Sequence, residues 1–438
     1  MRLLFFLIGL TSSWLAFKWS IWGFKVYPYL NLIYVLSVYS VIWLLHRRSS
    51  MVKLKIDLFL ILIVIFVLSS TVQFIFNYKT IWSVPPSKWL IQTITWIFPL
   101  KLLMDNIKSE RLIRNFLRGF EIGVKVQIIW SLIEVIFWYA YKIPINQVIF
   151  EGILKVDVGH TFINLRNYGA GIVYRVSGFN WDPAYFGILC AFIILTDPSI
   201  LWKLVSAIAL IMSNSRASIF GFSMTTVLLI LNYVTRRYFS NTQFKVKTRK
   251  VINVLLLFIA FGIIVIAITD FILPDYFRAT TAAIKNVFEE SKDVGTVRHL
   301  KYYTYSSLIL TKNPLIALFG YGPRSGGKFF CEEVNKGNIP SYMSAAKPST
   351  AWSPESSVIG ILVDSGILGF LVYIMIFFRI HKFTFKAISI SDDLRKKIGI
   401  FLMIVFWSSF FYSYIYVHYV ILFLIAMFSL DKKNGGWY

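Results

Sequence analysis

Residues 58–76 read LFLILIVIFVLSSTVQFIF, a run without a charged side chain. Such a run is typical of a transmembrane helix, which needs about 20 apolar residues to cross the hydrocarbon core of a bilayer. Similar runs recur along the 438-residue chain, which is 57% hydrophobic and only 15% charged. Open sheets leave unpaired edge groups in lipid, and a β-barrel would need alternating hydrophobicity. The sequence therefore predicts an all-α polytopic membrane protein.

The positions of Lys and Arg orient about twelve expected spans, because basic residues gather on the cytoplasmic side. Basic clusters follow the second, fourth, eighth and tenth spans and place both termini inside. A series beginning at Arg111 suggests a short basic helix on the membrane surface between the fourth and fifth spans. The expected spans, the first of them uncleaved, are 3–22, 27–45, 58–76, 89–103, 123–141, 184–195, 201–212, 217–234, 251–273, 358–378, 398–414 and 417–430.

This arrangement makes residues 1–438 a single integral membrane domain. It leaves an outer segment at 142–183 and a large outer loop at 274–355, between the ninth and tenth spans. The net charge of +24 is assigned to cations that face anionic lipid, and nucleic acid is not expected as a partner. The two cysteines, Cys190 and Cys331, show neither a disulfide framework nor metal-ligand spacing.

Three arginines depart from the positive-inside pattern: Arg175 in the outer segment, Arg216 after the seventh span and Arg298 in the large loop. Arg175 and Arg216 flank a pair of helices, so they should lie close together at one depth. A guanidinium offers a rigid fork of donors that suits phosphate, and such a cluster could hold a lipid pyrophosphate. The competing interpretation is that each arginine only extends to the lipid headgroups.

Acidic residues supply the candidates for proton transfer. Glu134 lies inside the fifth span, where a salt bridge between spans is the preferred interpretation. Asp364 precedes Ser365-Gly366-Ile367-Leu368-Gly369, where a break would let residues 355–364 form a separate surface helix. Glu355 follows Ser353-Pro354 and fits either a general base for a sugar hydroxyl or a helix-start residue favoured by the helix dipole.

A set of motifs between about Tyr174 and Phe370 resembles the bacterial O-antigen polymerase and O-antigen ligase families. The motifs agree in order, spacing and membrane side, and they are Arg175…Ser177-Gly178…Asp182-Pro183, Ser213-Asn214-Ser215-Arg216-Ala217, Arg298, Asn313-Pro314-Leu315…Gly320-Tyr321-Gly322 and Gly366-Ile367-Leu368-Gly369. Similar ligases carry a histidine just before the helix that follows the loop. Here that place reads Trp352-Ser353-Pro354-Glu355-Ser356. The departure favours a polymerase over a ligase.

The resemblance implies a GT-C-like glycosyltransferase in the bacterial plasma (inner) membrane. Its donor and acceptor would be oligosaccharides on undecaprenyl pyrophosphate, with membrane lipid around the protein and a chain-length regulator protein left open as a further partner. Arg175, Arg216 and Arg298 are expected to bind pyrophosphate, and Glu355 and Arg298 to act in catalysis. Asp182, Asp364 and His299 are the next candidates. No metal or other cofactor is expected. An O-antigen ligase and a polysaccharide flippase or secondary transporter remain the alternatives.

Overall fold

The described residues of the computed structural model are predominantly helical, with two small antiparallel hairpins. Strand β1 (Trp19–Ile21) pairs with β2 (Phe24–Val26), and β3 (Leu165–Asn167) pairs with β4 (Ile172–Tyr174). The helical class predicted from the sequence is confirmed, and the hairpins are short additions to it. The structure describes residues 1–21, 24–46, 56–76, 90–107, 109–156, 165–167, 172–180, 182–239, 303–339, 356–412, 414 and 417–431.

Among the described residues, nine apolar helices overlap expected spans, but the first of them, α1, ends at Ser12, whereas the expected first span, 3–22, continues through strand β1. Of these, α15 and residues Arg216–Arg236 of α9 are long and apolar enough, by length and composition, to cross a membrane. The expected ninth span, 251–273, lies outside the described residues. The nine are α1 (Arg2–Ser12), α2 (Pro28–His46), α3 (Leu58–Phe76), α7 (Pro183–Thr196), α8 (Ile200–Ser213), α9 (Arg216–Phe239), α15 (Ser357–Ser389), α16 (Asp393–Ser408) and α17 (His418–Leu430).

The fourth and fifth expected spans differ in detail from their helices. The fourth is a π-helical turn, η2 (Thr93–Ile97), that continues into α5 (Phe98–Asn106). The fifth belongs to α6 (Glu110–Tyr141), one helix of 32 residues. The separate surface helix expected from Arg111 is therefore wrong. The basic turns continue the helix of the expected fifth span because α1 packs along it without a gap. A Cβ added to Gly119 would lie 2.1 Å from the Phe6 carbonyl oxygen, and small residues permit such close approach of membrane helices.

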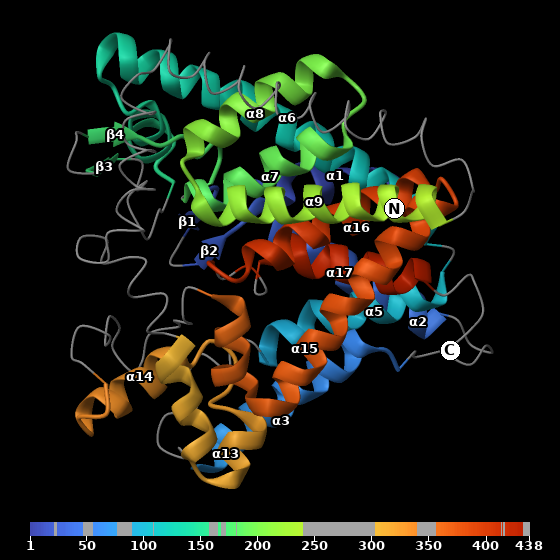
Figure 1. The fold of residues 1–438 in the computed structure, drawn as a ribbon, viewed down its shortest axis with the longest axis vertical. Helices are drawn as coiled ribbons and strands as arrows, with labels where there is room; N and C mark the ends of the chain where they lie inside the picture. The colour runs from blue at the N-terminus through green and yellow to red at the C-terminus, as the bar shows by residue number, and fades with distance from the viewer. Residues whose placement is uncertain are drawn as a thin grey trace.

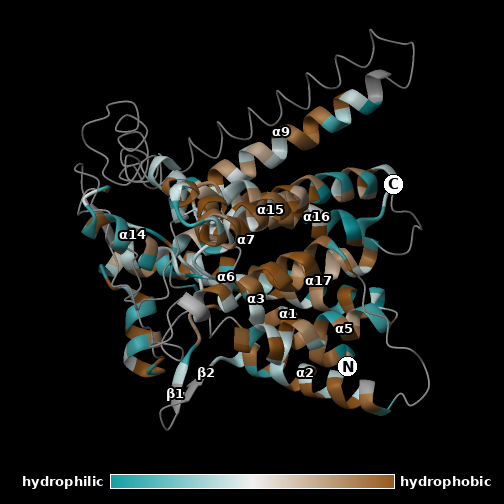
Figure 2. Cartoon of the chain, turned by 90° about the horizontal axis from the view of Figure 1, so that it is seen from below, coloured by the Kyte–Doolittle hydropathy of each residue, from teal (hydrophilic) through white to brown (hydrophobic). Residues whose placement is uncertain are grey.

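Helix α7 lies at the centre of the bundle. Its residues from Pro183 to Ile194 are buried, and it packs against α6, α8, α9 and α16. The ring of Phe192 meets Phe401 of α16 edge to face, with 5.4 Å between centroids. Figure 2 shows the apolar residues along α7, α15, α16 and α17 and more hydrophilic residues over α14 (Gly326–Asn335). Helix α7 thus runs through the apolar core of the bundle.

The two ends of the bundle carry different structures. The hairpins and α14 gather at one end, and the N-terminus lies at the other (Figure 1). Buried ion pairs occupy the N-terminal end, where Lys101 contacts Asp57 at 2.8 Å and Asp105 at 2.6 Å. The first end corresponds to the outer side expected from the sequence, and we call it the hairpin end.

The described part of the large loop, 303–339, is helical. It contains the 3₁₀ turn η4 (Ser307–Thr311), α13 (Pro314–Phe319) and α14, together with a small core of Ile309, Tyr321 and Phe329. That core also takes Ile359 and Val363 from α15, so the loop docks onto the first turns of that helix. Helix α15 breaks at Gly366, with φ 63° and ψ −164°, where the sequence predicts a break.

Candidate active site

The segment that carries Arg175 is anchored to α6 by a buried carboxylate. Glu134 accepts hydrogen bonds from the Gly178 N–H at 2.7 Å, the Ser177 N–H at 3.3 Å and the Tyr174 hydroxyl at 3.1 Å. The expected salt bridge between spans is therefore wrong for Glu134. It satisfies the backbone donors of a chain segment that enters the bundle without forming a helix, because buried N–H groups need partners.

Arg175 itself lies against the turn between α8 and α9. Its Nε donates to the Ser213 carbonyl at 3.1 Å, and the Val176 N–H donates to the Met212 carbonyl at 3.2 Å. The side chain is buried, and no carboxylate of the described residues lies within 4 Å of its guanidinium. A buried charge without a counter-charge is costly. This guanidinium is therefore suited to an anion that arrives from outside the protein.

Arg216 begins α9 three residues after the Ser213 carbonyl that binds Arg175. Between them Asn214 takes a left-handed conformation, with φ 46°, and closes α8. Ser215 bonds Ser218 across the first turn of α9, at 2.8 Å between hydroxyl oxygens. The segments of Arg175 and Arg216 therefore meet at one turn, although their convergence on a pyrophosphate stays a prediction.

Asp182 caps α7 beside a group of tyrosines. One carboxylate oxygen accepts the Ala184 N–H at 2.7 Å, and the other accepts the Tyr412 hydroxyl. The Tyr414 hydroxyl donates to the Ala184 carbonyl at 3.1 Å. With Tyr185 these side chains form a compact aromatic group in which neighbouring ring centroids lie 5.2–5.6 Å apart. Asp182 is thus engaged on both oxygens.

Asp364 holds the loop to α15. Its carboxylate accepts the N–H of Arg324 at 2.8 Å and of Ser325 at 3.1 Å, and its carbonyl accepts the Gly322 N–H at 2.8 Å. Two glycines allow this contact. A Cβ on Gly320 would lie 2.5 Å from the Asp364 backbone, and a Cβ on Gly366 would lie 2.4 Å from the Leu318 backbone. Both glycines take a positive φ that side chains disfavour.

Arg324 is the functional candidate that the sequence analysis missed. It has φ 60°, an uncommon conformation for a residue with a side chain, and its side chain is exposed. It interacts electrostatically with Tyr185 and His418, while Arg175 interacts with Tyr414. The charges of two arginines from different segments therefore act on the same tyrosine group. Arg324 could have been selected from the sequence by its position, because the turn-rich run Gly320–Gly327 belongs to the expected outer loop, where arginines are uncommon.

The start of α15 is hydrogen-bonded to the segment that carries Tyr412 and Tyr414. The Ser357 N–H donates to the Ser409 carbonyl at 2.9 Å, and the Ser357 hydroxyl oxygen accepts the Tyr414 N–H at 2.8 Å. The Tyr303 hydroxyl donates to the Phe410 carbonyl at 2.6 Å. Glu355 directly precedes this junction in the chain. Glu355, Arg298 and His299 all lie outside the described residues.

Ion pairs within the docked loop join Glu333 of α14 to Lys312 and Lys336. Burial alone would raise the pKa of Glu333 on α14. Hydrogen bonds from Lys312 and Asn338, with the charges of Lys312 and Lys336, outweigh burial and lower that pKa. Burial lowers the pKa of Lys328, and nearby Glu332 partly opposes the shift. Within the described ranges no group of three His, Cys, Asp or Glu residues could hold a metal ion.

A comparison with protein families matches this part of the chain. A family described as O-antigen ligase matches residues 201–374, which run from α8 to just beyond the break in α15. The match includes Arg216, Arg324 and Asp364, and Arg175 and Asp182 precede it. A comparison with curated proteins finds no match. Members of the matched family are integral membrane proteins that act on lipid-linked glycans. Residues 201–374 of the chain are thus similar to the O-antigen ligase family, which agrees with the resemblance carried by its motifs.

Proposed function

We propose that this protein polymerises lipid-linked polysaccharide repeat units of the O-antigen type. It does so at the outer face of the bacterial plasma (inner) membrane, as a multi-pass GT-C-like glycosyltransferase of about twelve spans. The buried guanidinium of Arg175, which has no carboxylate of the described residues beside it, carries this proposal. Arg324 lies on the loop docked at the same hairpin end, and the charges of both arginines act on one tyrosine group. Two guanidinium groups that come together from separate segments suit a ligand with more than one negative charge, such as a pyrophosphate.

The donor is the growing glycan on undecaprenyl pyrophosphate, and the acceptor is one repeat unit on the same lipid. A hydroxyl of the acceptor's terminal sugar attacks the anomeric carbon of the donor glycan. The bond between that carbon and the pyrophosphate oxygen breaks, and the lipid pyrophosphate leaves with both electrons. Glu355 takes the proton of the attacking hydroxyl. The pyrophosphate gains charge as it leaves, so fixed cations beside it stabilise the transition state.

The arginines divide this work by position. Arg175 is buried beside the turn that leads to Arg216, so these two bind the pyrophosphate within the bundle. Arg324 is exposed on the docked loop and closes over the ligand from the other side. Arg298 belongs to the same loop and contributes to both binding and catalysis. Covering the site by the loop excludes water, which would otherwise hydrolyse the activated glycan.

A ligase differs from this proposal only in its acceptor. The departure from the ligase pattern at Trp352–Ser356, where Glu355 stands in place of a histidine, favours the polymerase. A flippase or transporter commonly places its polar site near the bilayer midplane on broken helices. The buried arginine and the docked loop lie instead at the hairpin end, which favours a transferase.

The deciding experiment uses purified protein in vesicles with a lipid-linked repeat unit as the sole substrate. A ladder of lengthened glycans supports the polymerase. Transfer that requires a different lipid acceptor identifies a ligase, and movement of intact substrate across the bilayer without new bonds identifies a transporter. Arg175→Ala should abolish the ladder at unchanged protein abundance, and Arg175→Lys should restore it poorly because lysine lacks the planar fork. Lys336→Ala, which removes an exposed cation of the loop, is the matched control.

A further inference from the structure

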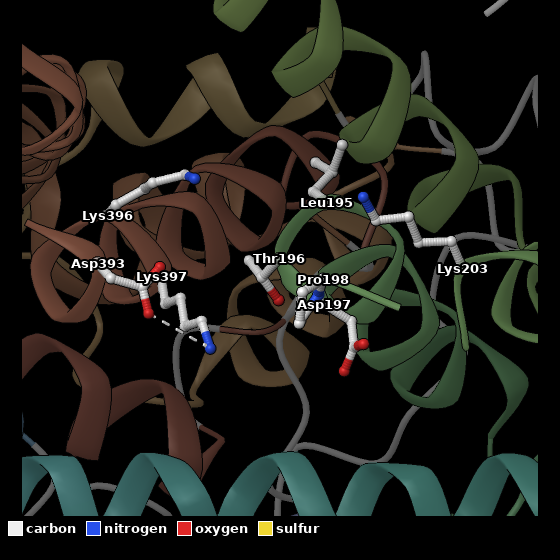
Figure 3. Close-up of a pocket in the computed structure, with 8 residues that line it drawn as sticks. All are labelled: Leu195, Thr196, Asp197, Pro198, Lys203, Asp393, Lys396 and Lys397. Carbon is white, nitrogen blue, oxygen red and sulfur yellow. Dashed lines mark ion pairs between the residues drawn. The ribbon is translucent and has the colours of Figure 1, made fainter. Parts of the chain in front are cut away.

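A second polar feature lies at the opposite end of α7 from the tyrosine group. A pocket of about 310 Å³ opens between the turn that joins α7 to α8 and the first turn of α16 (Figure 3). Its volume is at the lower end of the range for small-ligand pockets. The lining residues are Leu195, Thr196, Asp197, Pro198, Lys203, Asp393, Lys396 and Lys397.

The acids near this pocket already have cationic partners. Asp197 pairs with Lys125 at 2.6 Å, and it also caps the turn by accepting the Ser199 N–H at 2.9 Å. Lys397 pairs with Glu121 of α6 at 2.8 Å and more loosely with Asp393 at 3.6 Å. These pairs tie α6, α7 and α16 together. Their three carboxylates share two lysines, so the charges of Lys203 and Lys396 make the surroundings of the pocket net positive.

Lys203 and Lys396 differ from their neighbours. Both are half-buried, and neither forms an ion pair with another of the described residues. In Figure 3 their side chains extend toward the middle of the pocket from opposite sides, one from α8 and one from α16. Two ammonium groups held on opposite walls repel one another unless an anion lies between them.

We propose that this pocket binds a phosphate group between Lys203 and Lys396. Lysine is a common phosphate ligand, and its ammonium presents three donors to the phosphate oxygens. With the membrane orientation proposed above, the pocket lies at the cytoplasmic surface, where anionic lipids concentrate. The phosphate therefore belongs to the headgroup of an anionic lipid or to free inorganic phosphate, and the experiment separates these sources.

The test uses the purified full-length chain in detergent and measures binding of short-chain phosphatidylglycerol, short-chain phosphatidylcholine and inorganic phosphate. The variant Lys203→Ala/Lys396→Ala should bind the anionic ligand at least about tenfold more weakly, because one charge-assisted hydrogen bond is worth about 1.5 kcal/mol or more. Lys382→Ala/Lys386→Ala is the matched control. It removes two exposed lysines of α15, which the sequence places on the same side of the membrane but outside the pocket.

The outcomes are distinct. Loss in the pocket variant alone, with competition by inorganic phosphate, identifies a site that free phosphate can fill. The same loss without competition identifies a lipid headgroup site. Equal loss in both double variants, or no preference for phosphatidylglycerol over phosphatidylcholine together with no phosphate binding, overturns the proposal.

Lys203→Arg/Lys396→Arg keeps both charges and should bind within about threefold of the parent. If the alanine pair does not fold, loss of binding in the folded arginine pair counts against the site. Binding is the readout, so the result does not depend on polymerase activity.

Discussion

Replacing Arg324 with alanine tests the part of the site that the sequence did not reveal. The backbone of Arg324 is held by Asp364, whose carboxylate accepts its N–H at 2.8 Å and the N–H of Ser325 at 3.1 Å. Arg324→Ala therefore removes the guanidinium and leaves the anchor of the loop in place. Alanine also keeps the energetic cost of the positive φ about unchanged, because both residues have a Cβ.

The expected loss follows from the role of the side chain. Removing one donor that stabilises developing negative charge costs about 2.7–4 kcal/mol in the transition state, or about 10²–10³ in rate. The assay is the initial rate of ladder formation by purified protein in vesicles with saturating lipid-linked repeat unit. Arg324→Lys should give an intermediate rate because it keeps the charge and loses the fork.

Two comparisons make the result decisive. Lys336→Ala on the same loop should leave the rate within about twofold, because an exposed and loosely paired lysine contributes little. Asp364→Ala should expose the loop to protease, whereas Arg324→Ala should not. A rate near that of the parent in Arg324→Ala, while Arg175→Ala is inactive, would refute the assignment of Arg324 to the site.

The remaining predictions concern the base, the loop and its pH dependence. Glu355→Gln should slow transfer by about 10²–10⁴-fold and remove the acid limb of the pH profile; near-normal turnover would turn attention to Asp182, Asp364 and His299. Gly366→Ala should undock the loop, because its Cβ would lie 2.4 Å from a backbone atom at a positive φ, and protease cleavage within the loop should rise; unchanged cleavage would contradict the docking. Because the pKa of Glu333 is lowered, its contribution to loop stability is present above its ordinary value of 4.5 and fades as the pH falls through the lowered value. Amide exchange in α14 should accelerate there in the parent and change less with pH in Glu333→Gln; identical pH dependence in the two proteins would exclude this role.

Parts of the site were predictable because they depend on local patterns. The span pattern places the arginines at 175 and 216 on the side of the membrane where the charge rule does not expect them. The run from Asp364 to Gly369 contains the glycine at which α15 breaks. Arg324 was not selected because it resembles an ordinary turn residue among glycines. It is distinguished only by its partners in the fold, such as the Asp364 carboxylate that accepts its N–H from a distant part of the chain.

Roles that depend on partners were predicted less well. Glu134 in a span suggested a salt bridge, yet its partners are backbone N–H groups of a segment more than forty positions later in the chain. The sequence around Asp182 and Asp364 does not indicate their partners either. In the structure the Asp182 carboxylate caps α7, and the Asp364 carboxylate holds the docked loop. The choice of partner depends on which segments the fold brings together.

The sequence by itself determined the helical class and the approximate positions of the apolar helices, because lipid requires long runs of apolar residues whose backbone bonds close within each helix. It also predicted which arginines lie on the unexpected side. The tertiary structure alone decided that the loop docks through Asp364, that Arg175 lies buried against the turn between α8 and α9, and that two lysines face a pocket at the other end of α7. These contacts join residues far apart in the chain, and the packing of helices that brings them together leaves no periodic signal in the sequence.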